Sequence, residues 1–196
     1  MILDLLNEDE FKGFINVDRH NKTEKLSEDE QKEIIRKLQW KTGEEWKLYL
    51  LTYFVSQTGK IYTATKNRLI KPALNKQNGY YYFKISLQGE TKTEYIHRIV
   101  NALFNHDTRF DPIGVLVGAY DALDVHHIDF DKHNNTPNNL VWVDHRLHRE
   151  IHREVELNII DKSDINTVEK FKAYEDKKIK EKQRARDIET MYDNID

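Results

Sequence analysis

The sequence predicts an α+β protein in which a small antiparallel β-sheet region is followed by a β-loop-β-α unit. Between residues 53 and 87, aromatic and β-branched segments alternate with turn-forming residues. Residues 123–157 read as two short strands joined by a polar loop and followed by an amphipathic helix. Toward both ends of the chain, charged segments with helix signals predict helical arms.

The predicted N-terminal helix begins at a capping box. Ser27 is followed three residues later by Glu30, and Ile34, Ile35 and Leu38 then form one apolar stripe. We interpret this segment as a packing helix. At the other end, Asp164 or Thr167 is expected to cap a charged, largely solvated helix that runs to about Met191.

The middle of the chain is predicted to be β-structure that ends in a helix. The segments YFVS, KIYTAT and YYYFKISL favour strands, with turns at residues 57–59, 78–79 and 88–90. Alternation in the third segment places Tyr81, Phe83, Ile85 and Leu87 on an apolar face, opposite Tyr80, Tyr82, Lys84 and Ser86. A helix is expected over residues 95–104.

Composition limits the kinds of site that the chain can form. The 196 residues include no cysteine, which excludes a disulfide framework and any cysteine-ligated zinc site. A metal site would therefore use His, Asp, Glu or Asn. The start of the chain, MILDLLNEDEF, lacks the features of a signal peptide, and no segment is apolar enough to span a membrane. We therefore expect a cytoplasmic protein.

The net charge of −3 hides a basic block. Residues 46–105 carry nine lysines and arginines but only two glutamates, whereas the flanking segments are acidic. A local excess of positive charge suits a phosphate-binding surface. We divide the chain into an acidic helical segment (1–45), this basic β-rich region (46–105), a histidine-rich unit (106–157) and a charged helical arm (158–196).

Six of the nine histidines lie between residues 126 and 152. We expect strands over 123–128 and 141–143, a loop over 129–139, and a helix capped by Asp144. On this helix Leu147, Ile151 and Val155 form the buried stripe, and His145, His148 and His152 form a neighbouring one.

The spacing of the histidines predicts a metal site. His148 and His152, one helical turn apart, can hold an ion, although this pair alone is a weak signal. Successive strand residues point to opposite faces, so only one of His126 and His127 can join them. Three imidazoles leave an open coordination position and suit Zn, Ni, Co or Mn. The remaining histidine is then available as a general base for water.

The tract VHHIDFDKHNNTPNNLVWV, with the helix histidines, resembles the HNH (ββα-metal) endonucleases, in particular the phage-type homing endonucleases. The resemblance extends upstream through VSQTG, NGYYYFKISLQG and EYIHRIVNALF and covers roughly residues 46–153. It implies that His127 is the general base and that Asn139 braces the loop and orients this base. It implies metal ligation by His126, His148 and His152, and a position for His145 near the scissile phosphate.

The same resemblance implies a cofactor and a partner. The cofactor would be one divalent ion, Mg²⁺ or Mn²⁺. Family members often carry Asn or Asp at the His126 position and Asn at the His148 position, so the all-histidine set favours Zn²⁺ or another transition metal. The partner would be double-stranded DNA in a bacterial or phage-infected cell. The expected DNA contacts are Lys60, Lys66, Arg68, Lys71, Tyr82, Lys84 and Arg98.

Several alternatives stay open at this point. One site would nick DNA, and a double-strand cut would need a homodimer or two successive events. A non-catalytic, metal-stabilised DNA-binding protein and an RNase or toxin-type nuclease with the same chemistry are the competing functions. For single residues, His152 and His145 can be solvent-facing, His97 can be a packing or surface residue, and Asn134, Asn135 and Asn138 can simply shape the loop.

Overall fold

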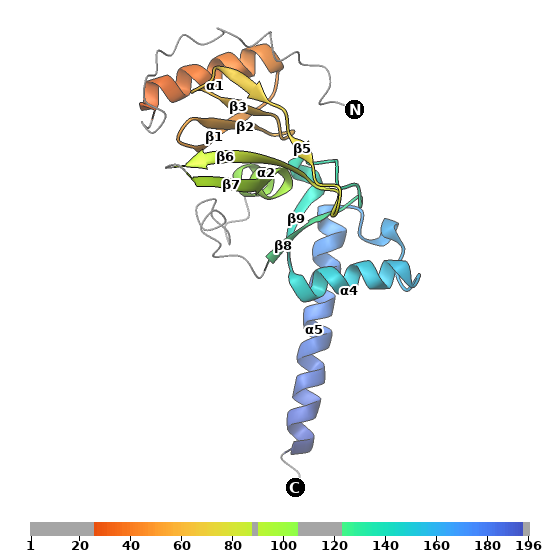
Figure 1. The fold of residues 1–196 in the computed structure, drawn as a ribbon. Helices are drawn as coiled ribbons and strands as arrows, with labels where there is room; N and C mark the ends of the chain where they lie inside the picture. The colour runs from red at the N-terminus through yellow and green to blue at the C-terminus, as the bar shows by residue number, and fades with distance from the viewer. Residues whose placement is uncertain (1–25, 88–89, 106–122, 194–196) are drawn as a thin grey trace.

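The protein is an α+β structure, as predicted, in a computed structural model that describes residues 26–87, 90–105 and 123–193 (Figure 1). Most of the predicted segment 1–45 and all of residues 106–122 lie outside the described ranges. The elements are α1 (Glu28–Thr42), β1 (Trp46–Leu50), β2 (Tyr53–Ser56), β3 (Ile61–Thr63), β4 (Arg68–Ile70), β5 (Ala73–Leu74), β6 (Tyr81–Leu87), β7 (Glu90–Tyr95), α2 (Ile96–Phe104), β8 (Leu123–His127), η3 (Pro137–Asn139), β9 (Leu140–Asp144), α4 (His145–Glu156), η4 (Lys162–Asp164) and α5 (Val168–Asp193).

Helix α1 covers an antiparallel sheet with the strand order β1-β2-β3-β4. The predicted capping box is present: the Ser27 hydroxyl accepts a hydrogen bond from the Glu30 amide, and the Glu30 carboxylate accepts one from the Ser27 amide. Ile34 and Leu38 are buried against Phe54 and other core residues of this sheet. The helix is therefore the packing helix that the apolar stripe predicted.

A second antiparallel sheet has the order β5-β6-β7 and adjoins α2. The predicted faces of β6 are confirmed for its central residues, since Phe83 and Ile85 are buried and Lys84 and Ser86 are exposed. The partner strand β7 has the sequence ETKTEY and largely exposed side chains. Its polar sequence explains why it was not predicted: its strand form comes from hydrogen bonding to β6.

The histidine-rich unit forms as predicted, with β8 paired antiparallel to β9 and α4 following directly. The Asp144 carboxylate caps α4 by accepting hydrogen bonds from the amides of Arg146 and Leu147. Val125 and Trp142 of this unit share one hydrophobic core with residues of α2 and β6. The basic region and the histidine-rich unit are therefore packed together through this face of the hairpin, while its other face forms a separate cluster with α4 and α5 that includes Val141, Leu147 and Phe171.

Helix α5 has a docked first part and an exposed second part. Its start is capped by the Thr167 hydroxyl, which accepts a hydrogen bond from the Lys170 amide at 3.2 Å. Phe171 is buried, and Lys178 pairs with Glu154 of α4 at 2.5 Å. Farther along, the helix extends away from the body (Figure 1), and its residues from 179 to 190 are exposed. No helix in the described part of the chain has the length and apolar character needed to cross a bilayer.

Candidate metal centre and catalytic site

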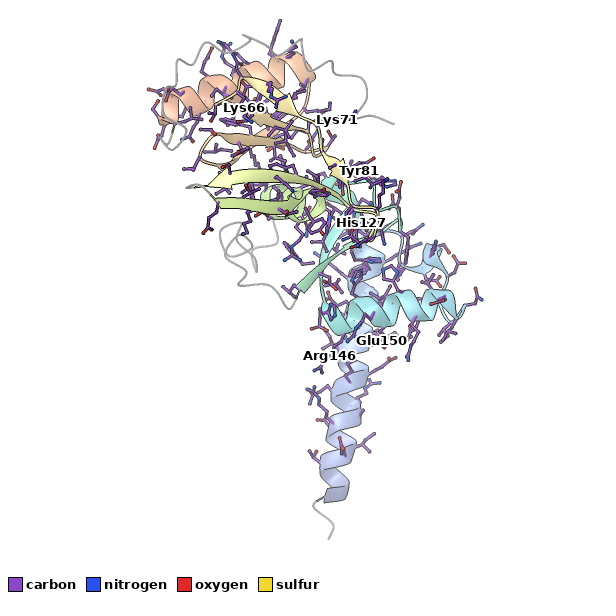
Figure 2. The ribbon with its side chains drawn as sticks, viewed as in Figure 1. Lys66, Lys71, Tyr81, His127, Arg146 and Glu150 are labelled. Atoms are coloured by element: carbon purple, nitrogen blue, oxygen red, sulfur yellow. The ribbon has the colours of Figure 1, made fainter. Side chains whose placement is uncertain are left out.

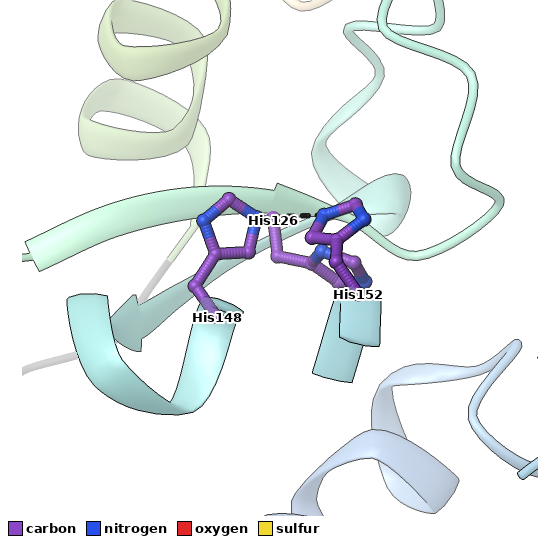
Figure 3. A group of neighbouring side chains, drawn as sticks. All are labelled: His126, His148 and His152. Atoms are coloured by element: carbon purple, nitrogen blue, oxygen red, sulfur yellow. Dashed lines mark hydrogen bonds between the residues drawn. The ribbon is translucent and has the colours of Figure 1, made fainter. Parts of the chain in front are cut away.

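Three histidines from two elements converge beside α4 (Figure 3). His126 comes from β8, and His148 and His152 come from successive turns of α4. One ligand atom from each ring lies within 4.8 Å of the others. The Nε2 atoms of His148 and His152 are 3.1 Å apart. The structure thus brings together the three residues that were predicted as metal ligands.

His126 has the environment of a buried ligand without a partner. Its side chain is 1% exposed, and among the described residues neither ring nitrogen has a hydrogen-bond partner. The ring stacks on Phe171 and meets Phe130 edge-on, at centroid distances of 5.3 and 4.9 Å. Buried polar atoms are nearly always paired. An ion bound between the three histidines would supply the missing partner, so the residues fit a metal centre.

Two of the three imidazoles, those of His126 and His152, have a lowered pKa. Burial, with smaller contributions from His148 and His152, lowers the pKa of His126 to about 2. The side chain of His152 is exposed, but desolvation by nearby protein atoms and the neighbouring His148 still lower its pKa to about 4. A metal ligand must be the unprotonated imidazole. At neutral pH both rings are therefore in the form that binds a metal ion.

Asp124, which was not predicted as a site residue, is a hydrogen-bond partner of two histidines at the metal centre, His148 and His145. Its Oδ2 atom lies 2.9 Å from Nδ1 of His148 and 2.8 Å from Nδ1 of His145. Burial raises the pKa of Asp124, but the hydrogen bonds from His148 and His145 more than offset this and hold that pKa below its usual value. The sequence contained a signal: Asp124 lies two residues before His126, and so on the same face of the strand.

His127 lies on the other face of β8, as strand geometry predicted. Its side chain is buried, and its Nε2 atom is 3.1 Å from Oδ1 of Asn135. Because an amide oxygen only accepts, Nε2 carries the proton in this pair and Nδ1 carries the lone pair. Burial lowers the pKa of His127, although the bond to Asn135 opposes that shift.

Asn139 braces the loop as expected, but the contact to the base comes from Asn135. The side-chain oxygen of Asn139 accepts from the Asp129 amide at 2.9 Å, and its nitrogen donates to Asp129 and to the Asn134 carbonyl, both at 2.8 Å. In the described part of the chain, its side-chain bonds hold the loop and none reaches His127. The side chain that contacts and orients His127 is instead that of Asn135, which was considered a loop-shaping residue.

Two ring side chains from the upstream region, those of Tyr80 and His97, lie beside His127. Tyr80 stacks on its ring at 5.8 Å and 21°, and His97 lies 5.4 Å away. His97 is buried, and burial followed by the charge of His127 lowers its pKa well below the usual value. On Tyr80, Nζ of Lys132 lies 4.9 Å from the ring centroid and donates to the Asn78 carbonyl. The turn before β6 is thereby tied to the loop of the histidine-rich unit.

The residues that were predicted to contact DNA fall into two groups. Lys66, Lys71 and Lys84 are exposed, and Figure 2 shows Lys66 and Lys71 at the sheet end of the molecule, away from Arg146 of α4. Arg68 and Tyr82 are half-buried.

Lys60 and Arg98 have internal partners instead. Lys60 pairs with Glu44, and both side chains are only 12% exposed. Arg98 donates to the Leu123 carbonyl at 3.0 Å and lies over the Trp142 ring. Both cations are therefore engaged by partners within the protein.

His145 is placed at the rim of the centre. Its side chain is 56% exposed, and its Nδ1 atom is held by Asp124. It is therefore separate from the three converging imidazoles, in agreement with its predicted position outside the ligand set.

Comparison with known proteins gives a match to one family model and matches to two named endonucleases. The NUMOD4 motif matches residues 39–86. An uncharacterized HNH endonuclease of Acanthamoeba polyphaga mimivirus is 31% identical over 105 residues, which are 52% of this chain and 28% of that protein. The DNA endonuclease I-HmuI of Bacillus phage SP01 is 30% identical over 113 residues, 58% of this chain and 56% of that protein.

Among solved structures, the chain is similar to one that describes DNA binding and cleavage by the HNH homing endonuclease I-HmuI. The TM-score is 0.47 at 27% identity, with 70% of this chain and 68% of that chain covered. The resemblance to HNH endonucleases that the histidine tract indicated is confirmed by the named relatives. The chain matches between about a quarter and just over half of the length of these curated relatives.

Proposed function

We propose that the chain is a metal-dependent HNH endonuclease that hydrolyses phosphodiester bonds of double-stranded DNA. The observation that carries this proposal is the division of labour across β8. A cluster of three imidazoles lies on one face, and a buried, oriented imidazole lies on the other, one residue away. A purely structural metal site has no need of His127. The names of the relatives support the same class of activity.

His126, His148 and His152 would hold one divalent ion. When bound, the ion supplies Lewis-acid stabilisation of the phosphate and of the departing oxygen. Imidazole ligands prefer transition-metal ions such as Zn²⁺, Co²⁺, Ni²⁺ or Mn²⁺, whereas Mg²⁺ prefers oxygen ligands. We therefore expect higher activity with a transition-metal ion than with Mg²⁺. Three protein ligands leave a coordination position open.

His127 is the proposed general base. The hydrogen bond to Asn135 fixes its ring and leaves the Nδ1 lone pair to take a proton from the attacking water. Because burial lowers the pKa of His127, this base is unprotonated at neutral pH. Asn139 keeps loop 129–139 in shape, which holds Asn135 in place.

The proposed DNA contacts combine the exposed cations of the sheet region with the rim of the metal centre. The exposed Lys66, Lys71 and Lys84 would contact phosphates, and the half-buried Arg68 and Tyr82 would make further DNA contacts. His145 would lie near the scissile phosphate. Since the described residues of one chain contain a single such centre, a monomer is expected to nick. Cleavage of both strands would need a homodimer or two successive events.

The test is cleavage of supercoiled plasmid in the presence of Mg²⁺, Mn²⁺, Co²⁺ or Zn²⁺. We expect open circles from the wild type and a loss of roughly 10²- to 10⁴-fold in rate for His127→Ala. His133→Ala, which changes an exposed loop histidine, is the matched control and should cut normally. If wild type and His127→Ala leave the same background, the nuclease proposal is lost. Parallel reactions with single-stranded DNA and RNA test the choice of duplex DNA.

A further inference from the structure

We propose that Asp124 is a positioning residue that fixes His148 in the orientation and tautomer that bind the ion, and that the same carboxylate oxygen anchors His145 at the rim. The inference rests on the part of the proposed function in which His126, His148 and His152 form the metal centre. It adds a residue that lies two positions before His126 in the chain and is not one of the three ligands.

The contacts that carry the proposal come from one carboxylate oxygen. Oδ2 of Asp124 lies 2.9 Å from Nδ1 of His148 and 2.8 Å from Nδ1 of His145. The Asp124 side chain is 29% exposed and that of His148 is 15% exposed, so this pair is partly shielded from water. Charge-assisted hydrogen bonds of this length are among the stronger ones in proteins.

The chemistry of the carboxylate decides which imidazole atom is free. An ionised carboxylate only accepts hydrogen bonds, so Nδ1 of His148 must carry a proton. In the neutral ring the lone pair is then on Nε2. This is the atom that lies 3.1 Å from Nε2 of His152, on the side of the cluster. Asp124 therefore selects the nitrogen that can bind the ion, as carboxylates behind metal-bound histidines commonly do.

The position of Asp124 also ties the strand to the helix. It lies on β8, on the same face as His126, and its two partners lie in the first turns of α4. One oxygen thus holds the ligand-bearing helix against the strand that supplies the third ligand. Loss of this oxygen would release the ring of His148 even if the fold were unchanged.

The experiment measures metal binding by the tag-free, full-length chain and does not depend on cleavage. Co²⁺ is titrated by visible absorption, and Zn²⁺ by calorimetry. We expect Asp124→Asn to bind each ion roughly 10- to 100-fold more weakly than the wild type. Asp124→Glu, which keeps a carboxylate, should recover part of the loss. Asp176→Asn, an exposed charge-matched change on α5, should bind like the wild type, and His126→Ala identifies binding at the centre.

A readout of the metal-free protein separates positioning from a general loss of structure. Long-range ¹H–¹⁵N spectra should show His148 protonated on Nδ1 in the wild type and a mixture of tautomers in Asp124→Asn, while the circular dichroism spectrum stays the same. Equal metal affinity of wild type and Asp124→Asn would overturn the proposal. So would a wild type that binds neither ion at His126, even if it cut DNA with Mg²⁺. Weaker binding by Asp124→Asn in a chain that cuts nothing would support positioning and refute the nuclease.

Discussion

His126 and His127 are consecutive residues of β8, yet their rings contact separate groups of side chains. The His126 ring lies 5.2 Å from His148 and 5.3 Å from Phe171, which come from α4 and α5. The His127 ring instead faces Tyr80 and Asn135. This arrangement allows a metal ligand and a base to be adjacent in the chain without competing for the same ion.

Replacing Asn135 should slow cleavage without weakening metal binding. The Asn135 side chain is the hydrogen-bond partner of His127, so Asn135→Ala frees the ring of the base. A positioned base contributes roughly 10²- to 10⁴-fold, and we expect a loss at or below the lower end of that range. Single-turnover cleavage rates and Co²⁺ titrations of the same variant check the two halves of this prediction. Asn138→Ala, an exposed change in the same loop, is the control.

The metal-free protein should lose stability as the pH falls below about 6.5, the pKa of an unperturbed histidine. The pKa of His126 is about 2 in the folded chain, so only the unfolded chain binds the extra proton as the solution becomes acidic. The stability is fully present above the unfolded value and declines toward acid, by up to about 1.4 kcal/mol per pH unit for one buried histidine. Urea unfolding at several pH values on either side of the unfolded pKa, with chelator, measures this slope.

The control for this pH dependence is a non-titrating residue at the same place. His126→Gln removes one histidine from the linkage, so its slope should be shallower by about the contribution of that histidine. The comparison uses slopes, because the substitution also changes stability at every pH. An identical slope in the two proteins would show that His126 is not the group that titrates.

Sequence reasoning succeeded where the signal is local. The capping box at Ser27 and the cap at Asp144 are set by neighbouring residues, and both are present. The opposite faces of His126 and His127 follow from strand geometry alone. The β-loop-β-α order and the spacing of His148 and His152 predicted that one of the two strand histidines joins the α4 histidines, and the resemblance to HNH endonucleases implied that this one is His126.

Contacts between distant segments could not be obtained in this way. The side chain of Asn135 reaches back eight residues to His127 because of the path of the loop, which no periodicity describes. Lys60 looked like an available cation, but its partner Glu44 is brought to it by the pairing of β1, β2 and β3. Strand β5 has only two residues, which are exposed, and β7 is exposed and mostly polar, so both take their form from pairing with β6.

Phe171 should contribute both to stability and to the metal centre. It is buried and stacks on His126 from the docked part of α5. We expect Phe171→Ala to lower the free energy of unfolding by about 3–5 kcal/mol and to weaken Co²⁺ binding. Ile188→Ala, in the exposed part of the same helix, should change stability by no more than about 0.5 kcal/mol. Unchanged stability of Phe171→Ala would argue that α5 is not docked.

Two glycines with similar backbone angles provide a matched pair. Gly59 and Gly43 have φ values of +85° and +69°, a region that costs other residues about 1–2 kcal/mol. A Cβ at Gly59 would collide with Ile96 of α2, whereas one at Gly43 would meet no atom of the described residues within 4 Å. Gly59→Ala should therefore be more destabilising than Gly43→Ala, by about 1–3 kcal/mol in urea unfolding. Equal losses would show that α2 can move away from the turn.

Lys84 and Lys60 should differ in their effect on DNA binding, although both belong to the basic block. Lys84 is exposed on β6, so Lys84→Ala should weaken duplex binding at all sequences and reduce the salt dependence of log K by about one phosphate contact. Lys60 is paired with Glu44, so Lys60→Ala should lower stability and leave that slope unchanged. Fluorescence anisotropy with a labelled duplex between roughly 50 and 200 mM salt, the range over which phosphate contacts are screened, measures both slopes. A reduced slope for Lys60→Ala would mean that Lys60 leaves Glu44 and contacts a phosphate when DNA binds. An unchanged slope for Lys84→Ala would mean that the duplex binds to another face of the protein.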